Sequence, residues 1–470
     1  MAIDFAAEVE KRKEAFLKDL FTLLKINSER DDKQASKVYP FGPGPSLAML
    51  EFLNIGQADG FETKNFDNYV GEILYGQGDE TLGIFVHTDV VPAGEGWTNP
   101  PYEPVIKEKK LYARGTQDNK GPALAAYYAL KILKELEVPF YKKVKFIIGT
   151  DEESGWKDMD YYLPKAGLPD FGFSPDARFP VVNGEKSNLT EYLHFGNENT
   201  GNFVLHAFNS GVQENCVPDE AQATVSSPVD LQAPFDKYLQ ENNLKGNFAK
   251  TGANIFLVIK GKSAHSSTPE SGINAGTHLA NFLSSYEFGA DARKFLDVSG
   301  QRLHKDFEGV NIGISFEDAD MGKLSVNPSV FAFQAKGQEN KIALNIRHPK
   351  GLTELDIQEK LEQKLGEAIE KVTISERINY QPHYLSEDDS LVQTLLATYR
   401  DHTGDEGQPQ TLGGGTYGRL MKRGVAFGAL FPESEFTMHQ TDEHIKLNEL
   451  YKAIEIYTDA LYRLACIKNS

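Results

Sequence analysis

Two short runs of almost uninterrupted apolar residues constrain the fold of this chain more than any other feature. They cover residues 82–86 and 144–148, and a helical pattern that opens with Gly121-Pro122 lies between them. A strand without polar alternation is usually covered on both faces, as in a sheet flanked by helices. The order strand, helix, strand therefore predicts an α/β fold with a mostly parallel sheet. Functional sites of such sheets lie beyond the carboxyl ends of the strands.

The character of the sequence changes in the middle of the chain. Polar, alternating segments at 190–195, 203–207 and 255–259 are typical of antiparallel strands with one solvated face. The periodicity of apolar residues predicts one amphipathic helix over the first 26 residues and an amphipathic run at 447–464. We therefore predict a helix-flanked, mostly parallel catalytic domain formed by residues 1–186 and 376–470. An inserted α+β lid domain at 187–375 interrupts it, and we expect hinges near Gly184 and Pro382.

The composition of the chain disfavours some classes of binding partner. The 470 residues carry a formal net charge of −19, which disfavours nucleic acid and anionic membranes as partners. Two cysteines, Cys216 and Cys466, are too few for a disulfide framework. No run of about 18 apolar residues occurs, and no apolar signal core follows the start. We expect a cytoplasmic protein without nucleic-acid or membrane partners.

Polar residues that can bind metal follow the predicted strands and loop entries. Taken singly, each has an ordinary alternative: a turn for Asp89, a helix cap for Asp118, a solvated acidic turn for 151–153. Taken together they give nitrogen and oxygen donors without sulfur, in the order His87, Asp118, Glu153, Asp176 and His439. Such a set suits two adjacent zinc or manganese ions that share one bridging carboxylate.

These segments resemble the co-catalytic dinuclear metallopeptidases that include aminoacylase-1, carnosinase and carboxypeptidase G2. The matching motifs, in order and spacing, are H-x-D-V-V-P at 87–92, D-N-K-G at 118–121, E-E at 152–153, S-P-D-A at 174–177 and the late His439. Further motifs are similar to the bacterial dipeptidase V (carnosinase-like) branch of that family. They are P-A-G-E-G-W at 92–97, Y-Y-L at 161–163 and G-G-G-T-Y-G-R at 413–419, together with the long insertion.

The resemblance implies two divalent metal ions, Zn²⁺ with Mn²⁺ or Co²⁺ as alternatives. His87 and Asp176 would hold one ion, Glu153 and His439 the other, and Asp118 would bridge them.

It also implies the catalytic groups of the core. Asp89 would orient His87, as carboxylates behind metal-bound histidines do. Glu152 would be the general base that takes a proton from the bridging water and later protonates the leaving amine. The peptide bond between Asp118 and Asn119 is cis in such enzymes.

In the lid, the resemblance implies residues that contact the substrate. His265 in G-K-S-A-H-S-S at 261–267 would stabilise the oxyanion of the reaction. Asn215 and Arg347 would hold the substrate, with the guanidinium on its C-terminal carboxylate. The glycine-rich segment is expected to add substrate-binding positions at Gly414, Gly415 and Thr416.

The expected reaction is hydrolysis of small peptides, namely dipeptides with a free N-terminus. Relatives with a shorter lid dimerise and receive the lid histidine from the partner subunit. The lid here is long enough to fold over its own site, so we expect a monomer. Two alternatives stay open: a deacylase of N-acyl amino acids with the same dinuclear site, and a non-catalytic metal or peptide binder. The presence of Glu152 beside Glu153 argues against the binder, because binding alone needs no base.

Overall fold

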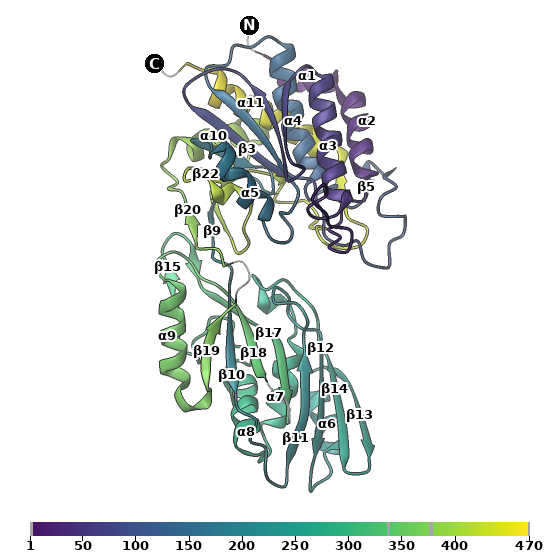
Figure 1. The fold of residues 1–470 in the computed structure, drawn as a ribbon, viewed down its shortest axis with the longest axis vertical. Helices are drawn as coiled ribbons and strands as arrows, with labels where there is room; N and C mark the ends of the chain where they lie inside the picture. Colours follow the sequence, from purple (N-terminus) through teal and green to yellow (C-terminus); the bar gives the residue numbers. More distant parts are fainter. Residues whose placement is uncertain (1–2, 336–338, 376–378, 469–470) are drawn as a thin grey trace. The chain divides into compact units, whose positions relative to one another are not determined.

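The chain forms two units in a computed structural model, which describes residues 3–335, 339–375 and 379–468 (Figure 1). The first unit comprises Met1–Gly184, Tyr384–Gln410 and Thr416–Ser470, and the second Glu185–His383 and Thr411–Gly415. The divisions at Gly184 and after His383 fall beside the expected hinges. Residues 185–186, 379–383 and 411–415 were expected with the core and group instead with the second unit.

The main sheet of the first unit has a parallel centre. Its strands run in the order β1-β2-β6-β3-β7-β22-β9-β20, with β21 paired to β9. Both β6 and β7 lie parallel to β3, whereas β1 and β2 add an antiparallel edge. The strands are β1 (Glu62–Phe66), β2 (Val70–Tyr75), β3 (Thr81–His87), β6 (Lys143–Gly149), β7 (Phe171–Ser174), β9 (Val182–Glu185), β20 (His383–Tyr384), β21 (Gln410–Leu412) and β22 (Gly424–Ala426).

Helices cover this sheet, as the uninterrupted apolar runs predicted. They are α1 (Phe5–Glu10), α2 (Lys13–Leu24), α3 (Pro43–Ala58), α4 (Lys120–Glu135), α5 (Lys157–Ala166), α10 (Ser390–Thr403) and α11 (Leu447–Leu461). On β3, Ile84 and Val86 share one apolar core with the buried face of α4. Phe85 points to the opposite face, where its ring centroid lies 6.2 Å from that of Tyr417. Both faces of β3 are therefore buried.

The N-terminal segment corrects one prediction. A single helix was expected over the first 26 residues, but α1 ends at Glu10 and α2 begins at Lys13. The Arg12 guanidinium donates to the Glu8 carbonyl oxygen, and the Arg12 backbone N–H bonds to Val9 instead. A side chain thus occupies the acceptor that a continuous helix would use.

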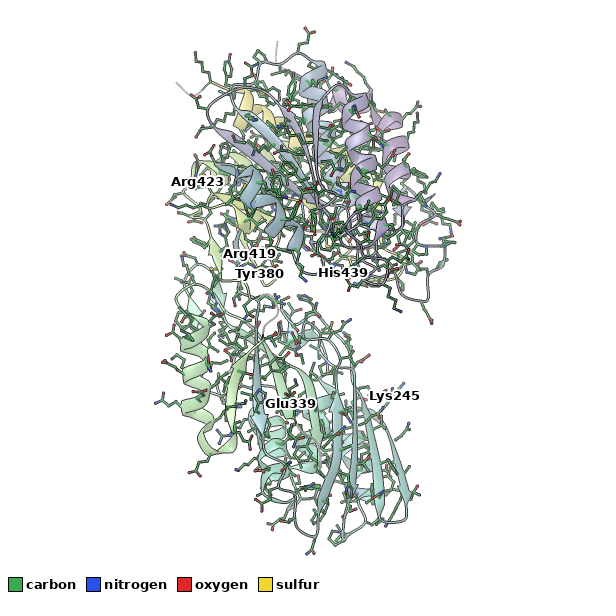
Figure 2. The ribbon with its side chains drawn as sticks, in the orientation of Figure 1. Lys245, Glu339, Tyr380, Arg419, Arg423 and His439 are labelled. Atoms are coloured by element: carbon green, nitrogen blue, oxygen red, sulfur yellow. The ribbon has the colours of Figure 1, made fainter. Side chains whose placement is uncertain are left out.

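The second unit is built on an antiparallel sheet of order β13-β14-β12-β11-β17-β18-β10-β19. Lys245 begins its edge strand β13 (Figure 2). The strands are β10 (Leu189–Phe195), β11 (Val204–Ser210), β12 (Glu220–Ser226), β13 (Lys245–Thr251), β14 (Asn254–Lys260), β17 (Ser325–Gln334), β18 (Asn340–Arg347) and β19 (Lys371–Ile374). The helices are α6 (Gln232–Glu241), α7 (Ala275–Leu283), α8 (Ala290–Asp297) and α9 (Glu354–Leu365).

Short strand pairs complete the fold. They are β4 (Val105–Lys107) and β24 (His444–Lys446) on either side of β5 (Lys110–Tyr112), β8 (Ala177–Arg178) with β23 (Ala429–Leu430), and β15 (Glu317–Asp318) with β16 (Gly322–Lys323). Within the described ranges, no helix is both long enough and apolar enough to cross a membrane.

One acidic side chain lies in the otherwise apolar core of the second unit. Glu191 on β10 alternates with Leu189 and Leu193, which belong to that core. Glu191 is 0% exposed, and neither of its carboxylate oxygens has a hydrogen-bond partner among the described residues. Burial raises the pKa of Glu191 to about 8, and the charges of Glu354 and Glu362 act in the same direction.

This burial predicts a pH-dependent stability. The folded state retains a proton that the unfolded chain releases above about pH 4.3, so stability is lost as pH rises from there through about 8. At about 1.36 kcal/mol per pKa unit, we expect roughly 2–4 kcal/mol less stability at pH 8.5 than at pH 5.5 from this group. Glu191→Gln should remove that difference, measured by urea unfolding of the full chain in chelator. Glu359→Gln on exposed α9 surface is the control, and an unchanged pH dependence in Glu191→Gln would contradict the assignment.

Candidate metal centre

Three neighbouring strands present the predicted ligands at one edge of the sheet. His87 is the last residue of β3, Glu152 and Glu153 follow β6, and Asp176 follows β7. Because β6, β3 and β7 are adjacent and parallel, their carboxyl ends meet at the same edge. The sheet topology therefore brings together side chains from three separate sequence motifs.

The Asp118 carboxylate lies between the two histidines. One oxygen, Oδ1, is 3.0 Å from His87 Nε2, and the other, Oδ2, is 2.9 Å from His439 Nε2. His439 Nε2 is also 3.2 Å from Glu153 Oε1, and His87 Nε2 is 3.5 Å from Asp176 Oδ2. Asp118 thus occupies the middle position that a bridging ligand requires, with one histidine and one further carboxylate on each side.

Among the described residues, two overlapping groups of side chains could hold metal ions. One contains His87, Glu152 and Asp176, and the other His87, Asp118 and Glu153. In each group the candidate ligand atoms lie within 4.8 Å of one another. His439 adjoins the second group through Asp118 and Glu153.

Backbone contacts fix the His87 ring. Its Nδ1 lies 3.0 Å from the carbonyl oxygen of Asp89 and 3.4 Å from the Asp89 carboxylate. When Nδ1 donates to the carbonyl, Nε2 is left to bind either a proton or a metal ion. Asp118 Oδ1 lies 3.0 Å from this buried nitrogen, which makes no hydrogen bond of good geometry within the described part of the chain. The Asp89 carboxylate itself accepts the backbone N–H of Glu153 at 3.1 Å. Asp89 therefore contacts two predicted ligands, the His87 ring and the backbone of Glu153.

The electrostatics of the group call for cations. Burial raises the pKa of Glu152 well above its usual range. Burial and the nearby Asp118 charge raise the pKa of Glu153 to about 7, and they also raise that of Asp176. Charged groups taken out of water are costly unless they are paired. Four carboxylates here face only two imidazoles.

The histidines respond in the opposite sense. Glu153 raises the pKa of His439 to about 12, with a further contribution from Asp118. Burial alone would lower the pKa of His87, but the Asp176 and Asp118 carboxylates raise it well above its ordinary value. Burial also opposes ionisation of Asp118, yet both histidines hold its pKa below the usual range. The donor set of imidazole nitrogens and carboxylate oxygens therefore fits divalent cations, which would replace the protons on both rings.

Asn119 joins two of the ligand segments. The peptide bond between Asp118 and Asn119 is cis, as the resemblance implies. The Asn119 amide donates to the Pro175 carbonyl at 2.8 Å and to Asp176 Oδ1 at 2.9 Å. The loop that enters α4 is thereby tied to the segment that carries Asp176.

Sequence reasoning missed a buried acid that supports the Glu152–Glu153 turn. Asp158 Oδ2 accepts the backbone N–H groups of Thr150 and Asp151, at 2.7 and 3.1 Å, and the Tyr417 hydroxyl at 2.6 Å. Burial raises the pKa of Asp158 to about 7. The only sequence signal was Tyr417 itself, which lies in the glycine-rich motif at 413–419.

His265 and Asn215 are neighbours in the second unit. The segments that carry them meet in an antiparallel bridge between Cys216 and His265, and the Ser266 N–H donates to the Asn215 carbonyl at 3.0 Å. Both side chains are exposed. Behind them the buried amide of Asn327 donates to the Cys216 carbonyl and to Ser266 Oγ.

Arg347 and the glycine-rich segment complete this neighbourhood. Arg347 is 3% exposed, and its guanidinium donates to Asn345 Oδ1 at 2.9 Å and to the Gly413 carbonyl at 3.1 Å. A Cβ added at Gly413 would lie 2.5 Å from the Cβ of Ser267, so the segment passes directly beside the His265 loop. Of the other predicted substrate-binding positions, Gly414 and Gly415 fall in the second unit and Thr416 in the first.

Comparison with known proteins agrees with this architecture. A protein named beta-Ala-Xaa dipeptidase from Lactobacillus delbrueckii subsp. lactis is 40% identical over 469 residues, covering 99% of each chain. A Staphylococcus haemolyticus protein named as a dipeptidase is 38% identical, over 98% of this chain and 99% of that one.

Two solved structures share the fold across nearly the whole chain. Human carnosine dipeptidase 1 has a TM-score of 0.58 at 14% identity, with 97% of each chain covered. Aminoacylhistidine dipeptidase from Vibrio alginolyticus has a TM-score of 0.57 at 14% identity, also with 97% of each chain covered.

The family assignment rests on most of the sequence. The family model described as "Peptidase family M20/M25/M40" matches residues 83–463, a span that includes every predicted metal ligand. The chain belongs to this family of peptidases and is a hydrolase.

Proposed function

We propose that this protein is a metal-dependent dipeptidase that hydrolyses dipeptides with a free N-terminus. The observation that carries the proposal is the Asp118 carboxylate set between His87 and His439, with Glu152 and Glu153 at the same sheet edge. Relatives that cover nearly the full length and are named as dipeptidases support the substrate class.

We assign two divalent ions to this edge, zinc foremost, with manganese or cobalt as alternatives. His87 and Asp176 would hold one ion, Glu153 and His439 the other, and Asp118 both. When bound, the ions polarise the scissile carbonyl and lower the pKa of an attacking water toward 7.

Glu152 is the proton carrier in this proposal. Its carboxylate form can take a proton from water, and the raised pKa that burial gives this carboxyl group favours keeping that proton until the amine leaves. Its backbone carbonyl accepts the Trp156 indole N–H at 2.8 Å, which holds the turn in place. The same carboxyl group then delivers the proton to the leaving amine.

The second unit would supply the groups that recognise the substrate. We assign His265 to the developing oxyanion, and Asn215, Arg347 and residues 414–416 to substrate binding. We further propose that the protein is a monomer and that His265 serves its own chain. Light scattering that found an obligate dimer in dilute solution would contradict this.

A hydrolysis panel tests the substrate class. Chelated protein is reloaded with zinc or manganese and given free dipeptides including β-Ala-His, one tripeptide, N-blocked dipeptides and N-acetyl amino acids. We expect metal-dependent cleavage of the free dipeptides alone, because the binding groups measure both ends of a short substrate. Cleavage of only the acylated compounds would instead identify a deacylase with the same metal centre.

The role of Glu152 is separable from metal binding. Glu152→Ala should retain two ions per chain, by elemental analysis, and lose turnover by several orders of magnitude, because the proton carrier is gone. Glu153→Ala is the matched comparison, since it should lose an ion as well as turnover. Substantial activity in metal-replete Glu152→Ala would refute the assignment.

Metal ions should also stabilise the protein against heat. Ions that bind only the folded state add about 2.7 kcal/mol per site at a free concentration of 100 times Kd. We expect zinc to raise the Tm of chelated wild-type protein, and His439→Ala to lose part of that increase. His402→Ala, which alters a histidine of the first unit that pairs with Glu455 and Asp459, should keep the full increase. An equal increase in His439→Ala would exclude His439 as a ligand.

A further inference from the structure

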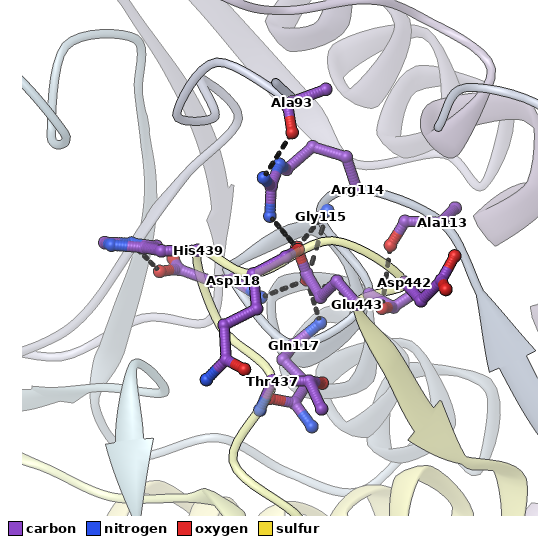
Figure 3. A network of polar contacts seen from close by, with 12 residues as sticks. Ala93, Ala113, Arg114, Gly115, Gln117, Asp118, Thr437, His439, Asp442 and Glu443 are labelled. Carbon is purple, nitrogen blue, oxygen red and sulfur yellow. Dashed lines mark hydrogen bonds and ion pairs between the residues drawn. The ribbon is translucent and has the colours of Figure 1, made fainter. Parts of the chain in front are cut away.

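Two loops of the first unit that carry predicted metal ligands are joined by side-chain hydrogen bonds. Residues 113–118 lead to Asp118, and residues 435–444 carry His439 (Figure 3). The His439 loop contains no helix before β24. His439 itself has a φ of 61°, in the left-handed region that residues other than glycine rarely adopt. Regular secondary structure therefore does not fix the position of this ligand.

The Gln117 carboxamide binds the backbone of the His439 loop. Its Nε2 donates to the carbonyls of Glu435 and His444, at 2.8 and 2.7 Å. Its Oε1 accepts the Thr437 N–H at 3.0 Å. Gln117 is 1% exposed, so these three bonds are made away from water. One side chain thus spans the loop on both sides of His439.

Glu443 makes the reciprocal contact. Its buried carboxylate accepts the backbone N–H groups of Gly115, Gln117 and Asp118, at 3.2, 2.7 and 3.3 Å (Figure 3). Arg114 balances the charge at 2.7 Å. The amide groups that lead into Asp118 therefore converge on a residue of the loop that carries His439.

We propose that Gln117 and Glu443 are positioning residues that fix the bridging ligand Asp118 against His439. The proposal rests on the proposed dinuclear site. Each side chain satisfies backbone groups of the opposite loop, so neither loop can shift alone without leaving buried polar groups unpaired, at a cost of about 1–3 kcal/mol for each group. The result is the 2.9 Å separation between Asp118 Oδ2 and His439 Nε2.

The two ions should depend unequally on this clamp. His87 ends β3 and Asp176 follows β7, so the sheet holds these two ligands. His439, by contrast, is held only by the loop that carries it. Removing the Gln117 carboxamide frees the His439 loop but keeps the Glu443 contacts to the backbone before Asp118. It should therefore weaken chiefly the ion assigned to Glu153 and His439, whereas a general loss of folding would weaken both.

The test measures both zinc affinities of the full-length protein, by competition with a chromophoric chelator. Gln117→Met keeps the length of the side chain and removes all three hydrogen bonds. We expect the affinity of one site to fall about 10–100-fold, the range typical of residues behind metal ligands, and the other by less than threefold. Cobalt spectra would show that the weakened site is the one lost in His439→Ala.

Asn183→Leu is the matched control, because Asn183 is also a buried amide of the first unit that donates to a backbone carbonyl, that of Leu385. It should change neither affinity. Gln117→Asn, which retains the amide but shortens its reach, should give the same selective loss in smaller measure and serves if Gln117→Met does not fold.

Equal losses at both sites, or two unchanged affinities, would overturn the clamp while leaving a dipeptidase with two ions intact. Wild-type protein that bound no divalent ion would overturn the proposed function, and the clamp with it. These outcomes are distinguishable because metal affinity is read without substrate.

Discussion

Acidic side chains crowded at one buried edge of a sheet are the constraint on which the first unit depends. Asp118, Glu152, Glu153 and Asp176 repel one another, and each loses hydration on folding, a penalty of several kcal/mol for an unpaired ion. Two imidazoles cannot balance four carboxylates. The edge is tolerable only because β3, β6 and β7 belong to a sheet covered on both faces, whose apolar core supplies the opposing stability. The excess of carboxylates gives this edge a negative potential that favours the binding of cations.

The precision of this edge comes from polar contacts outside regular structure. Asp158 holds the turn after β6, Asn119 ties the loop before α4 to Asp176, and Gln117 and Glu443 join the two remaining loops. In each case a buried side chain satisfies backbone groups that would otherwise be unpaired. A fully satisfied network of this kind fixes distances between ligands that a sheet edge alone would leave loose.

Local patterns in the sequence predicted what depends on local structure. The apolar runs at 82–86 and 144–148 identified β3 and β6, and polar residues at or after the ends of these strands are candidate ligands. The break between α1 and α2 was missed because it arises from competition between Arg12 and the backbone for the Glu8 carbonyl. Residues 411–415 were expected with the core, and nothing in their sequence signals the hydrogen bond that Gly413 accepts from the distant Arg347. A supporting acid such as Glu443 has no local signature, since buried and surface acids look alike in a sequence.

Glu443 and Glu191 show what distinguishes buried acids in the folded chain. Burial raises the pKa of both, but Glu443 faces Arg114 and three backbone N–H groups, whereas neither oxygen of Glu191 has a donor in the described structure. An acid surrounded by donors remains ionised and can organise a loop, and an acid without them is retained as a neutral group in an apolar core. The acids at the sheet edge belong to a third class. Their donors are too few and their oxygens converge on shared points, an arrangement that fits the divalent cations proposed for this edge.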